Sequence, residues 1–280
     1  MSKLALFAFT IGIAFSAGLS SAEPRVEVVK RADVEFIPLN PARGDASPKA
    51  GVLWGDIRQD GPSGALITFA DGFASPPHIH NITYRAVVIE GLVHNDDPQA
   101  ETMWMEQGSF WTQPAGEVHV TSVGPGGGTA FLEILLGPYL VRPSPELFDN
   151  GERPINVEAR NVVWLDAADV GWNSESDGTA GAEMSFLWGM PNAGKINGTF
   201  LKLPPAFVGT VETLGADFKA VLVSGALSHD AGELSPSVDL ESGSYFGSQG
   251  DVSHNLACAA DAECVLYVRV EGKYRLTGVE

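Results

Sequence analysis

The chain repeats one pattern of residues at an offset of 134–135 positions, so its two halves must be able to adopt the same fold. The matches are spread along both halves: Leu53-Trp54-Gly55 with Leu187-Trp188-Gly189, 85–92 (RAVVIEGL) with 219–227 (KAVLVSGAL), Gly108-Ser109-Phe110 with Gly243-Ser244-Tyr245, and His119 with His254. Matches spread this evenly are hard to obtain by chance from composition alone. The sequence therefore predicts two copies of one domain, at residues 25–145 and 155–280.

Each copy consists of short apolar, β-branched runs that are separated by turn residues. The chain contains 32 Gly and 18 Pro, and stretches such as 60–64 (DGPSG) and 124–128 (GPGGG) punctuate the runs. Many short strands with glycine and proline turns are typical of all-β sandwiches and barrels. We expect an all-β protein with a linker near residues 137–154.

The N-terminus has the layout of a secretory signal peptide. Lys3 supplies the positive charge, residues 4–19 are apolar, and Ser20-Ser21-Ala22 places small residues at a cleavage site. The apolar segment is shorter than the roughly 20 residues of a membrane-spanning helix. Residues 1–22 are therefore interpreted as a cleavable signal peptide, with cleavage near Ala22 and a periplasmic or secreted mature protein without a stable membrane span.

The cysteine content agrees with export. Cys258 and Cys264 are the only two cysteines in the chain, and a short hairpin-like segment separates them. In an oxidising compartment such a pair is expected to form a disulfide. A metal role is weaker, because the spacing does not fit a zinc knuckle and no histidine follows Cys264.

The charge of the chain argues against nucleic acid as a partner. The formal net charge is −18, with 17 Lys and Arg against 35 Asp and Glu. Binding of phosphate backbones and of anionic membrane surfaces depends on basic patches, and the sequence shows none. A small molecule is the expected partner.

Two histidines, His78 and His80, stand one residue apart at the start of an alternating run. Side chains at i and i+2 point to the same face of a strand, so the two imidazoles should converge on one side of a sheet. Such a pair suits a shared divalent metal ion, and His119 is a third candidate ligand. Hydrogen-bonded core histidines are the alternative, which is the usual role of a single histidine.

The two histidine segments resemble the two motifs of the cupin superfamily. Residues 72–91 read G-x5-H-x-H-x3-Y-x6-G, and residues 108–119 read G-x5-P-x-G-x2-H. With the repeat, the chain resembles a bicupin. The resemblance implies two tandem double-stranded β-helix barrels of jelly-roll type. It also implies that His78, His80 and His119 hold a divalent ion in the first barrel, of which Fe, Mn, Ni, Cu and Zn all suit imidazole ligands.

The chain departs from the cupin pattern at Tyr84, where the family has a glutamate. Tyr84 shares the parity of the histidine pair, so it should face the same interior and could ligate as phenolate, hydrogen-bond a metal-bound water or substrate, or fill the wall. We favour the hydrogen-bonding role, because a phenol has a reference pKa of about 10. Further polar candidates are Glu90, His94 and Glu133, which are interpreted as structural or surface residues.

The second copy has lost the metal motif. The repeat aligns Glu212, Leu214 and Phe218 with His78, His80 and Tyr84, and it keeps only His254. A single histidine beside leucine and phenylalanine does not make a metal site. We expect His254 to be a hydrogen-bonded core residue, with a part in an organic-ligand pocket as the alternative.

By resemblance to cupins such as the flavonol-cleaving bicupins, the expected function is metal-dependent dioxygenation of a small organic substrate. A non-catalytic ligand-binding or sensing protein is the alternative from another class. A metal-assisted isomerase or lyase is the third, and it needs a placed acid–base pair. Cupins often pair through edge strands, so the resemblance also makes a homodimer possible.

Overall fold

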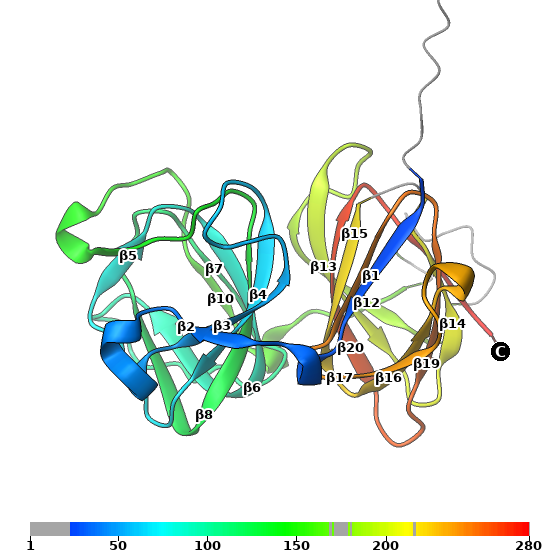
Figure 1. Cartoon of the computed structure of the whole chain (residues 1–280), viewed down its shortest axis with the longest axis horizontal. Coiled ribbons are helices and arrows are strands. Elements are labelled where there is room, and N and C mark those ends of the chain that lie inside the picture. The colour runs from blue at the N-terminus through cyan, green and yellow to red at the C-terminus, as the bar shows by residue number, and fades with distance from the viewer. Residues whose placement is uncertain (1–22, 168–169, 171–178, 180, 215–216, 280) are drawn as a thin grey trace, which may run out of the picture.

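A computed structural model describes residues 23–167, 170, 179, 181–214 and 217–279. The expected signal peptide, residues 1–22, lies outside them. The described chain forms two β-barrels that lie side by side along the long axis of the molecule (Figure 1). None of the helices in the described ranges is long and apolar enough to cross a bilayer.

The first barrel is built around a seven-stranded sheet with the strand order β10-β7-β6-β8-β4-β3-β2. Its longest strands, β6 and β8, bend and continue into the side of the barrel where β5 pairs with β9. The strands are β2 (Phe36–Pro38), β3 (Lys49–Trp54), β4 (Ser63–Phe69), β5 (His78–His80), β6 (Tyr84–Asp96), β7 (Phe110–Gln113), β8 (Val120–Ile134), β9 (Val141–Pro143) and β10 (Ile155–Val157).

The second barrel has an equivalent seven-stranded sheet, in the order β1-β18-β15-β20-β13-β12-β11, and a five-stranded sheet, β17-β16-β19-β14-β21. Its strands are β1 (Arg25–Val29), β11 (Leu165–Asp166), β12 (Glu183–Gly189), β13 (Ile196–Leu203), β14 (Val208–Glu212), β15 (Phe218–Ser224), β16 (Ala226–Asp230), β17 (Val238–Glu241), β18 (Tyr245–Gln249), β19 (Ser253–Cys258), β20 (Cys264–Glu271) and β21 (Arg275–Gly278). Short 3-10 turns connect strands at η1 (Arg31–Asp33), η2 (Pro41–Ala46), η3 (Ser144–Glu146), η4 (Ala159–Asn161) and η5 (Gly232–Leu234).

The repeat is visible in the strand register as well as in the sequence. Trp54 lies opposite Gly64 beside a bulge, and Trp188 lies opposite Gly198 beside the equivalent bulge. In both copies the indole packs so closely on the glycine that a Cβ there would overlap the ring. This explains why a tryptophan in one strand and a glycine in the next recur together.

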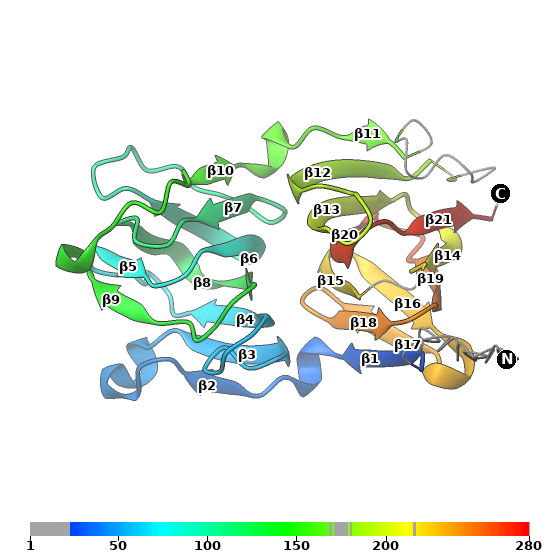
Figure 2. The same ribbon diagram turned by 90° about the horizontal axis from the view of Figure 1, so that it is seen from above.

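The barrels exchange their edge strands, and this corrects the expected boundaries at residues 25 and 155. β1 pairs with β18 of the second barrel, and β10 pairs with β7 of the first barrel. Figure 2 shows the two connections crossing between the barrels along opposite edges of the molecule. Each exchanged strand covers an exposed edge of the neighbouring sheet, which removes a site for aggregation. Sequence parity does not reveal which sheet a short edge strand joins.

The two seven-stranded sheets pack face to face and form a third core between the barrel interiors. Aromatic side chains from both copies meet in it, with the rings of Trp54 and Tyr245 4.8 Å apart and those of Phe131 and Tyr267 5.2 Å apart. Aromatic pairs at these separations add to the free energy of burial. The barrels are therefore joined by a continuous apolar interface.

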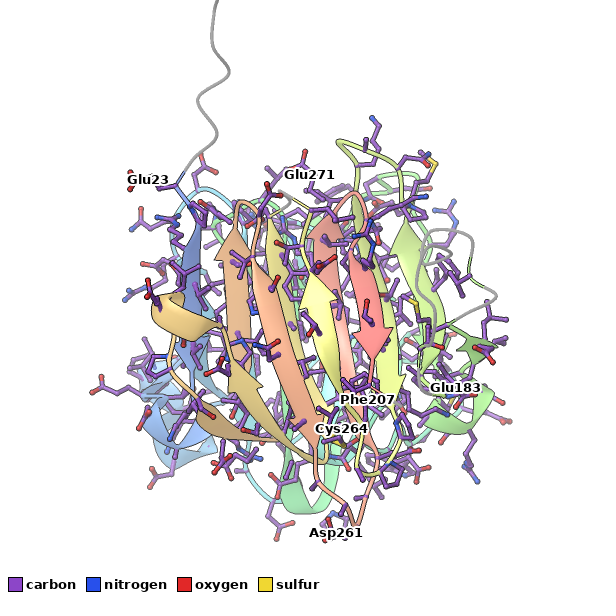
Figure 3. The ribbon with its side chains drawn as sticks, turned by 90° about the vertical axis from the view of Figure 1, so that its right-hand side faces the viewer. Glu23, Glu183, Phe207, Asp261, Cys264 and Glu271 are labelled. Atoms are coloured by element: carbon purple, nitrogen blue, oxygen red, sulfur yellow. A yellow bond between two sulfur atoms is a disulfide. The ribbon has the colours of Figure 1, made fainter. Side chains whose placement is uncertain are left out.

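The disulfide expected between Cys258 and Cys264 is present, and it closes the turn between β19 and β20 (Figure 3). Replacing both cysteines with serine is expected to lower the free energy of unfolding by about 2–3 kcal/mol, because a short loop is no longer closed in the unfolded chain. Urea denaturation of oxidised wild type and the double variant measures the difference. Reduced wild type should match the variant, and equal stability in all three samples would contradict the prediction.

Candidate metal centre

Two chain segments bring the three histidines of the first barrel together. His78 and His80 lie at the ends of the short strand β5, and His119 directly precedes β8. The backbones of His78 and His119 exchange two hydrogen bonds of 3.0 Å, which fixes the two segments against each other. The parity of Tyr84 with the histidine pair assumes one continuous strand, but β5 ends at His80 and β6 begins at Tyr84.

The imidazoles converge in the barrel as the spacing predicted. The ring centroid of His78 lies 5.0 Å from that of His80 and 4.2 Å from that of His119. One nitrogen from each ring lies within 4.8 Å of the others, and His80 and His119 are both buried. Among the described residues, this group contains three histidines and no carboxylate.

Backbone carbonyls set the orientation of all three rings. Nδ1 of His78 contacts the oxygen of Pro76 at 2.9 Å, Nδ1 of His80 that of Leu140 at 3.2 Å, and Nδ1 of His119 that of Glu117 at 3.2 Å. Because a carbonyl can only accept, each Nδ1 carries the proton and each Nε2 keeps its lone pair. In metal-binding histidines, the ring nitrogen that does not bind the metal usually donates its proton to such an acceptor.

Electrostatics favour the neutral, ligating form of the imidazoles. Burial lowers the pKa of His78 and His80, and it lowers the pKa of His119 to about 3, with a further contribution from His78. The Nε2 atom of His119 is buried and has no hydrogen-bond partner among the described residues. Neutral imidazoles whose Nε2 atoms keep their lone pairs fit a divalent metal ion and leave coordination positions open. His78, His80 and His119 could thus hold such an ion.

Tyr84 faces the barrel interior, as its parity predicted, but its hydroxyl has other partners. Its ring stands edge-on to His80, with centroids 5.1 Å apart. The hydroxyl donates to Oδ1 of Asn95 at 3.1 Å and accepts from Nε1 of Trp111 at 3.4 Å. Burial raises the pKa of Tyr84 above its usual range, which disfavours a phenolate. A catalytic role for Tyr84 stays a prediction.

A second tyrosine, Tyr139, contacts the site directly and was not found from the sequence. Its hydroxyl lies 3.2 Å from Nε2 of His80, and its ring stacks on the imidazole with centroids 4.4 Å apart. Burial raises the pKa of Tyr139 as well, so the phenol is a hydrogen-bond donor. It belongs to the expected linker, where no strand parity or motif spacing could indicate which way it points.

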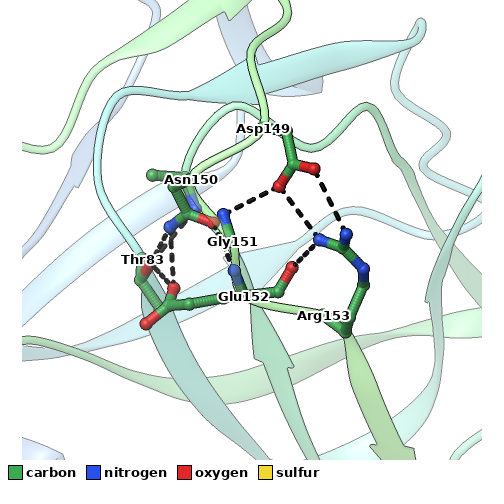
Figure 4. A network of polar contacts seen from close by, with 7 residues as sticks. Thr83, Asp149, Asn150, Gly151, Glu152 and Arg153 are labelled. Carbon is green, nitrogen blue, oxygen red and sulfur yellow. Dashed lines mark hydrogen bonds and ion pairs between the residues drawn. The ribbon is translucent and has the colours of Figure 1, made fainter.

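Side-chain hydrogen bonds hold residues 149–153 of the same linker against the first barrel. Thr83 and Asn150 both hydrogen-bond Glu152, and Asp149 pairs with Arg153 at 2.9 Å (Figure 4). Thr83 also accepts from the backbone of Ala115, in the second histidine motif, at 3.1 Å. This segment therefore connects both histidine motifs to the chain that leaves the first barrel.

The other polar candidates lie away from the triad, in agreement with their structural interpretation. Glu90 is exposed and pairs with Arg31 at 2.6 Å, and His94 contacts the backbone of Met103 at 3.3 Å. Glu133 is fully buried between the barrels, 3.8 Å from Arg269.

In the second copy, the structure shifts the expected alignment by one residue. Val211, not Glu212, lies opposite His254 in the way that His78 lies opposite His119. The predicted alignment was wrong because the chain between Val211 and Phe218 is one residue longer than its counterpart between His78 and Tyr84 in the first copy. Glu212 instead pairs with Arg275 at 2.8 Å.

His254 is a hydrogen-bonded core residue, as expected. Its Nδ1 lies 2.8 Å from Nε2 of His229, and its Nε2 lies 2.9 Å from Oγ of Ser248. Burial lowers the pKa of His229 to about 4 and that of His254 to about 3, so both are neutral near neutral pH. Within the described part of the chain, no metal-binding group forms in this barrel.

Comparison with known proteins agrees with this architecture. The profile of a family described as a domain of unknown function, DUF4437, matches residues 27–277. No curated protein sequence is significantly similar to the chain.

Among solved structures, a protein from Nostoc punctiforme described as a putative dioxygenase has a TM-score of 0.66 and 15% identity, with 89% of this chain and 83% of that chain covered. The 7S globulin of Momordica charantia has a TM-score of 0.55 and 9% identity, covering 89% and 84%. A variant of salicylate 1,2-dioxygenase from Pseudoaminobacter salicylatoxidans has a TM-score of 0.50 and 12% identity, covering 75% and 71%. At such identities the likeness shows the fold, and it confirms two tandem cupin barrels.

Proposed function

We propose that this chain, which belongs to the DUF4437 family of domains of unknown function, is a metal-dependent dioxygenase that acts on a small organic substrate. The observation that carries the proposal is the triad of His78, His80 and His119, with its carbonyl-fixed rings and with Nε2 atoms that keep their lone pairs. Three neutral ligands leave coordination positions for substrate and O2, and redox-active ions such as Fe, Mn, Ni and Cu suit imidazole. Two structural neighbours described as dioxygenases support this reaction class.

The test is a labelling experiment on protein that has been loaded separately with each candidate ion. A panel of small phenolic and hydroxy-acid compounds is screened for oxygen uptake, and any active compound is converted under isotopically labelled O2. A dioxygenase transfers both atoms of one O2 molecule to the product. Incorporation of one atom, or uptake that does not depend on the loaded ion, would contradict the proposal.

A non-catalytic binding protein is the second candidate, and the second barrel favours it. His254 hydrogen-bonds His229 and Ser248 in that barrel, where the described residues form no metal-binding group, and the 7S globulin shares the fold. Saturable binding of a compound, without its conversion in air or under anaerobic conditions, would support this candidate over the enzyme. An isomerase or lyase has less support, because the hydroxyl of Tyr84 already bonds Asn95.

We also propose that the protein is exported and processed near Ala22. The proposal rests on the signal-like residues 1–22 and on the disulfide in the second barrel, since such bonds persist in oxidising compartments. Cell fractionation followed by sequencing of the mature N-terminus tests it. Intact Met1 in the cytoplasmic fraction would contradict it.

A further inference from the structure

The chain that leaves the first barrel returns to the triad and holds one of its histidines. β9 pairs with β5 in antiparallel register, so that Val141 lies opposite His80. The backbone of Leu140 donates to Oδ1 of Asn81 at 2.8 Å, and Nδ2 of Asn81 donates to the oxygen of Pro138 at 3.0 Å. These contacts fix residues 138–141 beside the imidazole of His80.

Two consecutive residues of this segment contact the two nitrogens of His80. The carbonyl of Leu140 accepts from Nδ1 at 3.2 Å, which leaves the lone pair on Nε2. The hydroxyl of Tyr139 donates to that lone pair at 3.2 Å, and the tyrosine ring stacks on the imidazole. Tyr139 therefore hydrogen-bonds the same nitrogen with which His80 would bind an ion.

An ion at Nε2 of His80 would take this acceptor away from Tyr139. A buried hydroxyl without a partner is costly, so the phenol needs another acceptor close by. Three neutral imidazoles leave a divalent ion its full positive charge, which favours an anion at an open coordination position. Tyr84 cannot serve this anion in the same way, because its hydroxyl donates to Asn95.

We propose that Tyr139 is a positioning residue of the metal centre, whose hydroxyl bonds His80 in the free protein and an anionic ligand in the metal-loaded protein. Tyr139 would take part of the role of the missing carboxylate, by orienting an anionic substrate without binding the ion. The proposal rests on the metal site of the proposed function, and it names anions as the ligand class.

Titration of cobalt-loaded protein with azide tests the proposal, because cobalt(II) absorbs in the visible range and azide is a small anion. Tyr139→Phe removes the hydroxyl and keeps the ring on His80, and Tyr274→Phe, at a buried tyrosine of the second barrel whose hydroxyl contacts Thr199, is the control. We expect Tyr139→Phe to bind cobalt at least as tightly as wild type, since the competing hydrogen bond is gone. Its dissociation constant for azide should rise about tenfold, because a hydrogen bond to a charged group is lost. Tyr274→Phe should keep the wild-type azide affinity.

The outcomes separate this proposal from the proposed function. Wild type that binds no cobalt overturns both. Cobalt binding with unchanged azide affinity in Tyr139→Phe overturns the role of Tyr139 and leaves the metal site intact. Cobalt affinity that falls in Tyr139→Phe also overturns it, because the hydroxyl would then be a ligand of the ion.

Discussion

Replacing His119 with alanine is expected to abolish stoichiometric binding of a divalent ion. His119 supplies one of only three imidazoles in the cluster, and its Nε2 has no other partner among the described residues. Loss of a residue that only hydrogen-bonds a metal ligand already lowers metal affinity roughly 10–100-fold, so loss of a ligand itself should lower it further. Elemental analysis of protein purified without added metal, together with calorimetric titration, measures the effect.

His94→Ala is the matched control for this variant. His94 is buried in the same barrel and also contacts a backbone carbonyl, but it is not part of the cluster. Its replacement should leave one ion per chain, as should His254→Ala in the second barrel. Equal metal contents in wild type and in folded His119→Ala, judged by circular dichroism, would show that the triad does not hold the ion.

Replacing Arg269 with methionine is expected to destabilise the protein by about 3–5 kcal/mol, because it leaves the buried Glu133 without its nearest opposite charge. Arg269 contacts Asp217 at 2.7 Å and lies 3.8 Å from Glu133. Tyr267 donates to Glu133 at 3.4 Å, so this network joins the two barrels through their interface. Urea denaturation measures the loss, and the exposed Arg58→Met is the control.

The loss of stability in Arg269→Met should depend on pH, because Glu133 titrates. Burial raises its pKa from 4.5 to about 7, and it outweighs the opposing effect of Arg269. A group whose pKa is higher in the folded than in the unfolded protein contributes stability that is fully present below its unfolded-state pKa. This contribution is lost as the pH rises through the folded-state pKa, and for Glu133 it amounts to about 3 kcal/mol. The destabilisation in Arg269→Met should therefore be largest near pH 8 and shrink as the pH falls below about 7, where Glu133 takes up a proton in the folded protein.

Glu133→Gln separates this cause from a general packing defect. The stability of wild type relative to Glu133→Gln should fall from about pH 4.5 to pH 7, and then stay level. A difference that does not vary with pH would assign the effect to packing alone.

The histidine triad could be predicted because its geometry is mostly local. His78 and His80 share a face through strand spacing, and the second motif places His119 beside them. The same reasoning placed Tyr84 in the barrel interior. It could not predict the hydrogen-bond partners of the Tyr84 hydroxyl, because Asn95 lies on the far half of β6 and Trp111 lies on β7.

By itself, the sequence determined the duplicated all-β fold, the histidine triad, the disulfide and the lack of a second such triad among the described residues of the second copy. All of these depend on spacing over short stretches or on the repeat. Only the tertiary structure decided that the barrels exchange β1 and β10, that Glu133 is buried against Arg269, and that Tyr139 contacts His80. Those features join residues that are far apart in the chain, and their side chains meet only once both sheets and the linker have packed.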